Sequence, residues 1–474
     1  MKKKEKTQLA QALAAQRKAE EERQARKGKP DEPDKPLNLY GWKQYAIAND
    51  GGYYDLRTDD TGEVPVRLFL TPKLLAEAED ILYAQIVNAT QFPGVKMVVI
   101  TPDVHYGYGV PVGSVILTDG TLAMGPVGYD VGCGMVSARS NVPWPSATPE
   151  KRLAFNKAVM RRVAMGAGHS SKTRLAHISK AEFNEIVRGG ADYYIRKYGA
   201  SLDRSRAERN RIPVDDDWDI PWGGRGRPER GLSQLGSLGG GNHFMELQRC
   251  EETSTLFVQV HSGSRGFGHG LATNYFDLAK AEKPDKIKHL DMGYFTPDSP
   301  YHRSYLNAVA AGGNFAIVNR LVLYEQIAEA FEEVFGEVWV HRKGATRAFP
   351  AGHPNLAGTI WETTGHPVLI PGSNRDYSFI LKPLPGAVKS GFSVNHGAGR
   401  RLSRGTARRN LDQKEVNRIY RESGVLVNDN ANVPLDESDA CYKSSQEVVD
   451  AVVQAGLAEI QYRLWPLASL KGTD

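Results

Sequence analysis

The sequence Gly128-Tyr129-Asp130-Val131-Gly132-Cys133-Gly134-Met135 places a carboxylate three residues before a thiol and a glycine on each side of the cysteine. Aspartate is a hard oxygen ligand and cysteine a soft sulfur ligand. A borderline divalent cation such as zinc or manganese accepts both when imidazoles complete the shell. The glycines permit tight turns, so both side chains can point at one centre. A single cysteine among glycines is also typical of a small buried side chain, and this motif alone leaves both interpretations open.

Three histidine motifs further along the chain favour a site. QLGSLGGGNHF contains His243, and an apolar strand at 256–260 runs directly into His261 of HSGSRG. One histidine after a strand is usually structural, but two that are framed by glycines are better explained by a common site. In NHGAGR, His396 lies beside glycine amides and a guanidinium, a combination that suits a phosphate at the imidazole.

Composition and length bound the class of protein. The chain has 474 residues, of which 41% are hydrophobic and 24% charged, as in ordinary soluble globular proteins. Its net charge of +5 permits a polyanionic partner without requiring one. Cysteines that are widely spaced and odd in number do not form a disulfide framework, which favours a reducing, cytoplasmic location. No apolar run reaches about 18 residues, and no apolar segment follows the basic N-terminus, so we expect neither a membrane span nor a signal peptide.

The chain divides into an extension and a folded body. Residues 1–36 are rich in Lys, Glu, Gln and Ala and end in a proline-containing linker. They predict a charged helical extension, which is either a solvated tail or an RNA- or partner-binding segment. The body occupies 37–474, and its residues 201–230 resemble a mobile surface insertion whose arginines either contact nucleic acid or are solvated. Periodicity predicts helices at 72–88, 150–165, 180–198 and 301–335 and a strand at 95–101.

Eight sequence blocks together resemble one known family, the RtcB-type RNA-splicing ligases, from about residue 64 to Lys471. These blocks are PDVHYGYGVPVG, VGYDVGCGM, QLGSLGGGNHF, HSGSRG, HRKGATRAFPAGHP, IPGS, NHGAGRR and PLASLKG. Their number and order make the resemblance highly specific. We therefore expect an α+β fold with a single large catalytic domain.

The resemblance implies an enzyme that uses GTP and one or two Mn²⁺ ions. Such an enzyme joins RNA ending in a 3′-phosphate or 2′,3′-cyclic phosphate to RNA with a 5′-hydroxyl, sometimes with an archease-like activator. Carried over by position, His396 is the nucleophile that takes GMP. The implied metal ligands are Asp130, Cys133, His243 and His261, with Cys133 bridging two ions. The implied GMP contacts are Asn242, Glu246, Ser373, Ser378, Gly397, Ala398, Gly399 and Lys471.

The sequence departs from the family pattern at two places. The family usually carries a further metal-ligating histidine in a DVxHN-like segment, but here the run 331–338 leads almost directly into His341, which belongs to the next block. The family's PGSMG is also altered, to PGSNRD at 371–376. Three hypotheses remain: an RNA ligase in which water or a carboxylate replaces the missing imidazole, a diverged nucleotidyltransferase acting on another end or substrate, and a non-catalytic RNA-binding homologue.

Overall fold

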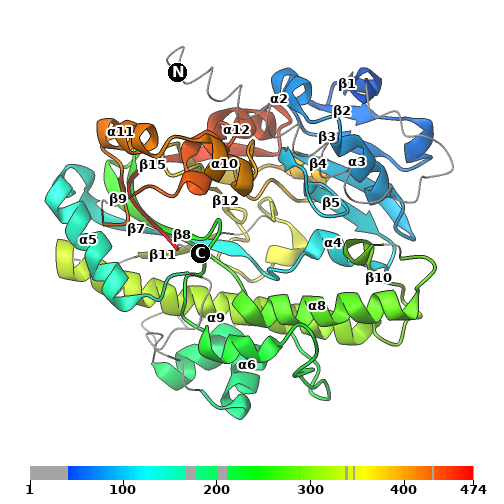
Figure 1. The fold of residues 1–474 in the computed structure, drawn as a ribbon, viewed down its shortest axis with the longest axis horizontal. Coiled ribbons are helices and arrows are strands. Elements are labelled where there is room, and N and C mark those ends of the chain that lie inside the picture. The colour runs from blue at the N-terminus through cyan, green and yellow to red at the C-terminus, as the bar shows by residue number, and fades with distance from the viewer. Residues whose placement is uncertain are drawn as a thin grey trace.

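The computed structural model describes residues 41–166, 175, 178–199, 211–287, 289–336, 347–429 and 432–472, together with the backbone of 340–344 (Figure 1). The expected helical extension at 1–36 lies outside these residues, as does 201–210 of the expected insertion. The described chain mixes helices with largely antiparallel sheets, which confirms the predicted α+β class.

The largest element is an eight-stranded sheet with the order β11-β7-β9-β8-β15-β13-β12, to which β14 adds by parallel pairing with β15. Although four strands separate β7 from β12, Met135 of β7 and Leu369 of β12 belong to one buried apolar cluster. The sheet is therefore strongly curled around its inner face. Its strands are β7 (Gly134–Pro143), β8 (Phe244–Cys250), β9 (Thr255–Ser262), β11 (Val340–Gly344), β12 (Val368–Ile370), β13 (Ser378–Pro383), β14 (Leu426–Val427) and β15 (Ala458–Lys471).

A second sheet of five strands packs against the first. Phe69 and Val99 of this region share a buried apolar cluster with Val368 and Phe379 of the curled sheet. The strands follow chain order: β1 (Ala46–Asn49), β2 (Tyr53–Leu56), β3 (Val66–Leu68), β4 (Val95–His105) and β5 (Val112–Thr118). A two-stranded ribbon pairs β6 (Leu122–Ala123) with β10 (Tyr294–Phe295).

Helices cover the outer face of the curled sheet, and α8 (Arg265–Glu282) and α9 (His302–Phe335) run side by side beneath it (Figure 1). The helices are α2 (Pro72–Glu77), α3 (Leu82–Thr90), α4 (Met124–Val127), α5 (Pro149–Arg162), α6 (Lys180–Tyr198), α8 (Arg265–Glu282), α9 (His302–Phe335), α10 (Arg404–Asn410), α11 (Gln413–Ser423) and α12 (Ser445–Gln454). Residues of α5 and α9, including Phe155, Leu323 and Phe331, pack in one cluster with Met245 and Val258 of the sheet.

Helix α9 is long and apolar enough to cross a membrane by length and composition, with a mean hydropathy of 1.3 in its most apolar window. In this structure 83% of that window is buried inside the protein. The burial accounts for the apolar composition, because a core helix that packs on several sides needs apolar residues around most of its circumference.

Two expectations differ from the structure. The helix expected at 72–88 is two helices, and the backbone of Ala78 between them is extended. A tertiary hydrogen bond competes here with the helical periodicity of 72–88: the Tyr83 hydroxyl at the start of α3 donates to Asp60 over 2.7 Å. Residues 211–230 are solvated only in part: Trp218 is buried and its indole donates to Ser304 over 3.0 Å, whereas Arg225 and Arg227 are exposed. The helices expected at 150–165, 180–198 and 301–335 are confirmed.

Candidate functional site

Strand pairing brings the separate histidine and cysteine motifs to one edge of the curled sheet. His261 near the end of β9 pairs with Met135 at the start of β7 and with Phe244 at the start of β8. Phe244 in turn pairs with Lys471 at the end of β15. Because neighbouring strands are antiparallel, the loops at these four strand ends meet at a single place.

The predicted metal ligands lie together there. The Sγ atom of Cys133 is 3.0 Å from Nε2 of His261 and 3.7 Å from Nε2 of His243. All three ligand atoms lie within 4.8 Å of one another. Asp130 joins the cluster through His243, whose Nε2 lies 2.9 Å from Oδ2 of the carboxylate. The structure therefore brings all four predicted ligands into one cluster.

Backbone carbonyls hold both imidazoles in the orientation that metal binding requires. Nδ1 of His243 lies 3.0 Å from the carbonyl oxygen of Leu238, and Nδ1 of His261 lies 3.1 Å from that of Asn242. An Nδ1 that faces a carbonyl carries the proton, which leaves a lone pair on Nε2 directed into the cluster. Two imidazole nitrogens, a sulfur and a carboxylate fit a borderline divalent cation, and this chain's donor set is therefore consistent with a metal centre.

The cluster's electrostatics agree with that assignment. Burial alone would raise the pKa of the Asp130 carboxyl, but the hydrogen bond and charge of His243 hold it below its ordinary value. Burial raises the pKa of the Cys133 thiol well above its ordinary value, and the charge of Asp130 raises it further. Burial, with the charges of the neighbouring histidines, lowers the pKa of His261 well below its usual value. His261 is thus a neutral ligand, and the Cys133 thiol needs a cation to lose its proton.

Two glycines make room for this arrangement. A Cβ at Gly263 would lie 2.2 Å from Oδ1 of Asp130, so only glycine leaves space for the carboxylate. Gly132 has a φ of +74°, and a Cβ there would lie 2.9 Å from the Cα of Gly313 in α9. The glycines of the opening motif therefore let the metal-binding loop approach the core helix closely.

Helix α9 anchors the ligand loops through two buried polar residues that the sequence analysis did not select. Nη1 of Arg320 donates to the carbonyl oxygens of Gly132 and Ser262, each over 2.8 Å. The Asn319 amide donates to the carbonyl of Gly263 over 3.2 Å. Burial lowers the pKa of Arg320 to about 10, so the guanidinium stays charged at neutral pH. The sequence shows only an Asn-Arg pair between the apolar runs 315–318 and 321–323, which does not reveal which carbonyls the pair meets.

His396 points its Nε2 atom at the same cluster. This atom lies 3.0 Å from Nε2 of His261, and the His396 backbone N–H donates to Oδ2 of the buried Asp103 over 3.3 Å. Burial lowers the pKa of His396, while the charges of Asp103 and Asp130 oppose that shift. A neutral imidazole with Nε2 directed at the metal ligands is available as a nucleophile. Asp103 belongs to the PDVHYGYGVPVG block but was not among the predicted site residues.

Three of the residues predicted to contact GMP lie in a buried polar group on the inner face of the sheet, namely Glu246, Ser378 and Lys471. Nε2 of Gln248 donates to Oε2 of Glu246 over 2.7 Å and to Oγ of Ser378 over 3.2 Å. Burial raises the pKa of Glu246 to about 7, although the Gln248 hydrogen bond and the charge of Lys471 lower it. Nζ of Lys471 lies 5.1 Å from the centre of the Phe244 ring, which links it to the metal-binding edge.

The remaining predicted contacts lie in loops. Ser373 is buried, and its Oγ accepts from the backbone N–H of Arg375 over 3.4 Å. The carbonyl of Gly397 accepts from the Asn395 amide over 2.7 Å. Ala398 is buried, the Gly399 carbonyl accepts from the Lys443 backbone N–H over 2.9 Å, and the Asn242 side chain is exposed. The backbone carbonyl of Asn242 instead faces Nδ1 of His261 and fixes the tautomer of that ring, a role that sequence reasoning did not predict.

A cluster of charges borders the site and was also missed. The buried carboxylate of Glu437 lies 2.7 Å from Nη1 of Arg404, 3.4 Å from Nη1 of Arg400 and 3.3 Å from Nζ of Lys471. Asp436 binds Arg404 and Arg408 over 3.1 and 2.9 Å. These four cations exceed the two carboxylates, so the cluster carries net positive charge that suits phosphate groups.

The fold and the site together define an α+β protein with a partly buried Cys-His-His-Asp cluster, an adjacent histidine, His396, and a basic border. Comparison with known families gives the class. A family model described as tRNA-splicing ligase RtcB matches residues 85–338 and 336–472. The chain belongs to this family, as the sequence blocks predicted.

Individual relatives agree with the family assignment. The tRNA-splicing ligase RtcB of Nanoarchaeum equitans is 32% identical over 462 residues, covering 86% of this chain and 95% of that protein. The tRNA-splicing ligase RtcB of Thermococcus kodakarensis is 30% identical, covering 87% and 96%. The RNA-splicing ligase RtcB of Mycobacterium tuberculosis is also 30% identical, covering 82% and 100%. The similarity therefore extends over nearly the whole length of the relatives.

Proposed function

We propose that this protein is a GTP- and Mn²⁺-dependent RNA ligase. It joins an RNA 3′-phosphate or 2′,3′-cyclic phosphate end to a 5′-hydroxyl RNA end through a His396–GMP intermediate. The observation that carries the proposal is the 3.0 Å separation of the Nε2 atoms of His396 and His261, which directs the candidate nucleophile at the metal ligands. The relatives named as RNA-splicing and tRNA-splicing ligases support the RNA substrate.

The chain's own residues suit the first step. The neutral Nε2 of His396 attacks the α-phosphorus of GTP, a bond from nitrogen to phosphorus forms, and pyrophosphate leaves. Asp103 holds the His396 backbone, and the excess positive charge around Glu437 compensates phosphate charge. A bound divalent cation would add charge neutralisation at the leaving group and activation of the attacking hydroxyl. GMP then passes to the RNA 3′-phosphate, and the 5′-hydroxyl displaces it.

The two departures from the family pattern concern different parts of this mechanism. In the altered PGSNRD segment, Asn374 bonds the Tyr420 hydroxyl and Arg375 bonds the carboxylate of Asp439. These side chains anchor their own loop. The absent DVxHN-like histidine concerns the second metal, for which water or a carboxylate would replace the imidazole. We further propose that the protein acts in the cytoplasm and is helped by an archease-like activator.

The test of guanylylation uses α-labelled GTP with Mn²⁺ and the full chain. The wild type should become labelled, and His396→Ala should not. His289→Ala is the matched control because its side chain is exposed. It should label like the wild type. Absence of label on the wild type would contradict the proposed mechanism.

A second measurement separates the RNA ligase from a diverged nucleotidyltransferase. A cyclic-phosphate RNA and a 5′-hydroxyl RNA are incubated with the protein, GTP and Mn²⁺, and the joined product is quantified. Guanylylation with no joined product would favour the diverged enzyme. The absent DVxHN-like histidine is the observation behind that alternative. Counting manganese per chain then shows whether a second ion is held.

A further inference from the structure

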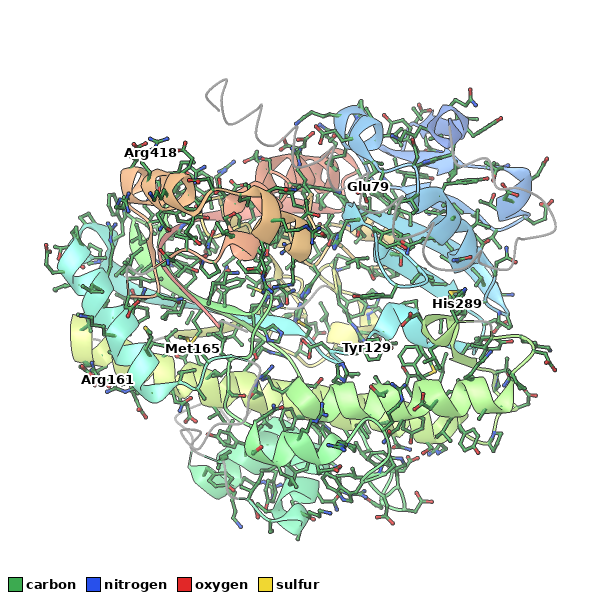
Figure 2. All side chains as sticks on the ribbon, viewed as in Figure 1. Glu79, Tyr129, Arg161, Met165, His289 and Arg418 are labelled. Carbon is green, nitrogen blue, oxygen red and sulfur yellow. The ribbon has the colours of Figure 1, made fainter. Side chains whose placement is uncertain are left out.

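A groove of about 270 Å³ lies beside the candidate site. It is lined by Tyr108 from the β4–β5 connection, by Val112 of β5, and by Tyr129, Phe276 and Asp291. Figure 2 shows Tyr129 between α4 and α8. The volume is slightly below the usual range for small-molecule pockets, about 300–1,000 Å³, and suits a single ring system. No residue that the sequence analysis assigned to the metal or to GMP lines this groove.

Both sides of the groove are continuous with the site. On one side, Tyr129 directly precedes Asp130, which contacts the metal ligand His243. On the other side, β4 leads to Tyr108, and Asp103 in β4 accepts the backbone hydrogen bond of His396. Gly113, which lines the groove, lies against Asp103, because a Cβ at Gly113 would lie 2.8 Å from Oδ1 of that carboxylate. A strand whose end reaches His396 can therefore continue toward the groove.

The aromatic side chains of the groove are arranged for stacking. The Tyr129 ring lies 5.1 Å from Phe276 and 5.0 Å from His269, in both cases at an angle of 27°. Its hydroxyl donates to Asp291 over 3.2 Å, so the ring is held rigidly. Tyr108 is 72% exposed, which leaves its ring free to cover a ligand. Aromatic rings that line a groove in this way are the usual platform for nucleobases of single strands.

The charges around the groove fit a nucleotide. The Asp291 carboxylate at the groove wall is an acceptor for an exocyclic amine of a base. Burial lowers the pKa of His269, and the charges of Arg230 and Arg225 lower it further while that of Asp130 opposes them, so both guanidinium groups act on this wall. Arg225 is already bound by the Asp277 carboxylate over 2.6 and 2.8 Å, which leaves Arg230 as the guanidinium considered for a phosphate. Guanidinium groups next to an aromatic platform bind the phosphates of a strand whose bases stack.

We propose that this groove binds the nucleobase next to the reacting RNA end, with Tyr108 stacking on the base. The inference rests on the proposed RNA ligase function and deepens it, because it names where the strand lies beyond its reacting end. RNA is favoured over a protein partner because both groove walls lead to His396 and the metal ligands, where only the end of a substrate is expected.

Binding of two short single-stranded RNAs tests the proposal. One ends in a 2′,3′-cyclic phosphate and the other in a 5′-hydroxyl, and each carries a fluorophore at its far end for anisotropy. For at least one of them, Tyr108→Ala should raise Kd about tenfold, within the usual range for one lost base stack. Tyr108→Phe keeps the ring and should stay within about twofold. Tyr45→Ala, an exposed tyrosine outside the groove, is the control and should not change Kd.

An abasic nucleotide next to the reacting end provides the specific readout. It should weaken wild-type binding about tenfold but weaken Tyr108→Ala binding less than about twofold, because the stacked partner is already gone. Unchanged Kd in Tyr108→Ala for both RNAs, or abasic and tyrosine effects that simply multiply, would overturn the groove assignment. GTP labelling of the wild type is measured separately. If the wild type is not labelled while the abasic and Tyr108→Ala effects still depend on each other, only the ligase mechanism is overturned.

Discussion

The Nε2 atoms of His261 and His396 lie 3.0 Å apart. The Nδ1 atom of His261 faces the Asn242 carbonyl, so its Nε2 carries a lone pair and cannot donate. His396 must therefore donate a proton to it or share a cation with it. Either arrangement couples the candidate nucleophile to the metal ligands, so loss of the metal should change the surroundings of the His396 imidazole.

Cys133→Ala should abolish tight metal binding and guanylylation together. The variant removes the sulfur that lies within 3.7 Å of both ligating imidazoles, while the surrounding loop keeps its backbone bonds. Metal per chain is measured by mass spectrometry after dialysis, and label transfer from GTP is measured on the same sample. Cys250→Ala, a buried cysteine at the far end of β8, is the control and should keep its metal. Normal labelling of Cys133→Ala would show that the thiol is structural.

Arg320→Met should destabilise the fold by about 3 kcal/mol and weaken metal binding. Two buried carbonyls, those of Gly132 and Ser262, lose the charged donor that bonds them over 2.8 Å. Urea unfolding gives the stability, and metal titration gives the affinity. Arg320→Lys keeps the charge, but its shorter side chain cannot bring the donor nitrogen to the position of Nη1 between the two carbonyls, so it should recover only part of the loss. Full stability in Arg320→Met would show that the ligand loops do not depend on this contact.

The sequence identified the predicted metal ligands but not the residues that hold them in place. The predicted ligands could be found because each stands in a glycine-rich block with a recognisable neighbour. Arg320, Asn319 and Glu437 could not, since their importance comes from which distant backbone or side chain they meet in the curled sheet. Helices α5, α6 and α9 followed from periodicity, whereas the break between α2 and α3 depends on a tertiary hydrogen bond at Tyr83.

Glu437→Gln should raise KM for GTP about tenfold with a smaller effect on kcat. The neutral amide keeps the shape but releases Lys471 and Arg404, which the carboxylate holds over 3.3 and 2.7 Å. Initial rates of guanylylation at varied GTP provide KM and kcat. Glu459→Gln is the control, because this glutamate on β15 is half-exposed and pairs with Lys382 away from the cluster. An equal drop in kcat at unchanged KM would argue against a role in nucleotide binding.

Glu246 should make the protein less stable as pH rises from about 4.5 to about 7. Its pKa is about 7 in the folded protein against 4.5 for the free side chain, chiefly because burial penalises the charged form. The folded state therefore binds a proton more tightly than the unfolded state. The resulting stabilisation is complete below pH 4.5 and lost as pH passes 7, with a total of about 3 kcal/mol.

The difference in unfolding free energy between the wild type and Glu246→Gln isolates this contribution, because glutamine does not titrate and all other groups are shared. Urea unfolding at several pH values between 4 and 8 should show the wild type losing stability relative to the variant across that range. Gln248 donates to Oε2 of Glu246, and the amide of the variant still offers an oxygen to that donor. A difference that is flat with pH would mean that Glu246 titrates normally and that its surroundings are more hydrated than the structure indicates.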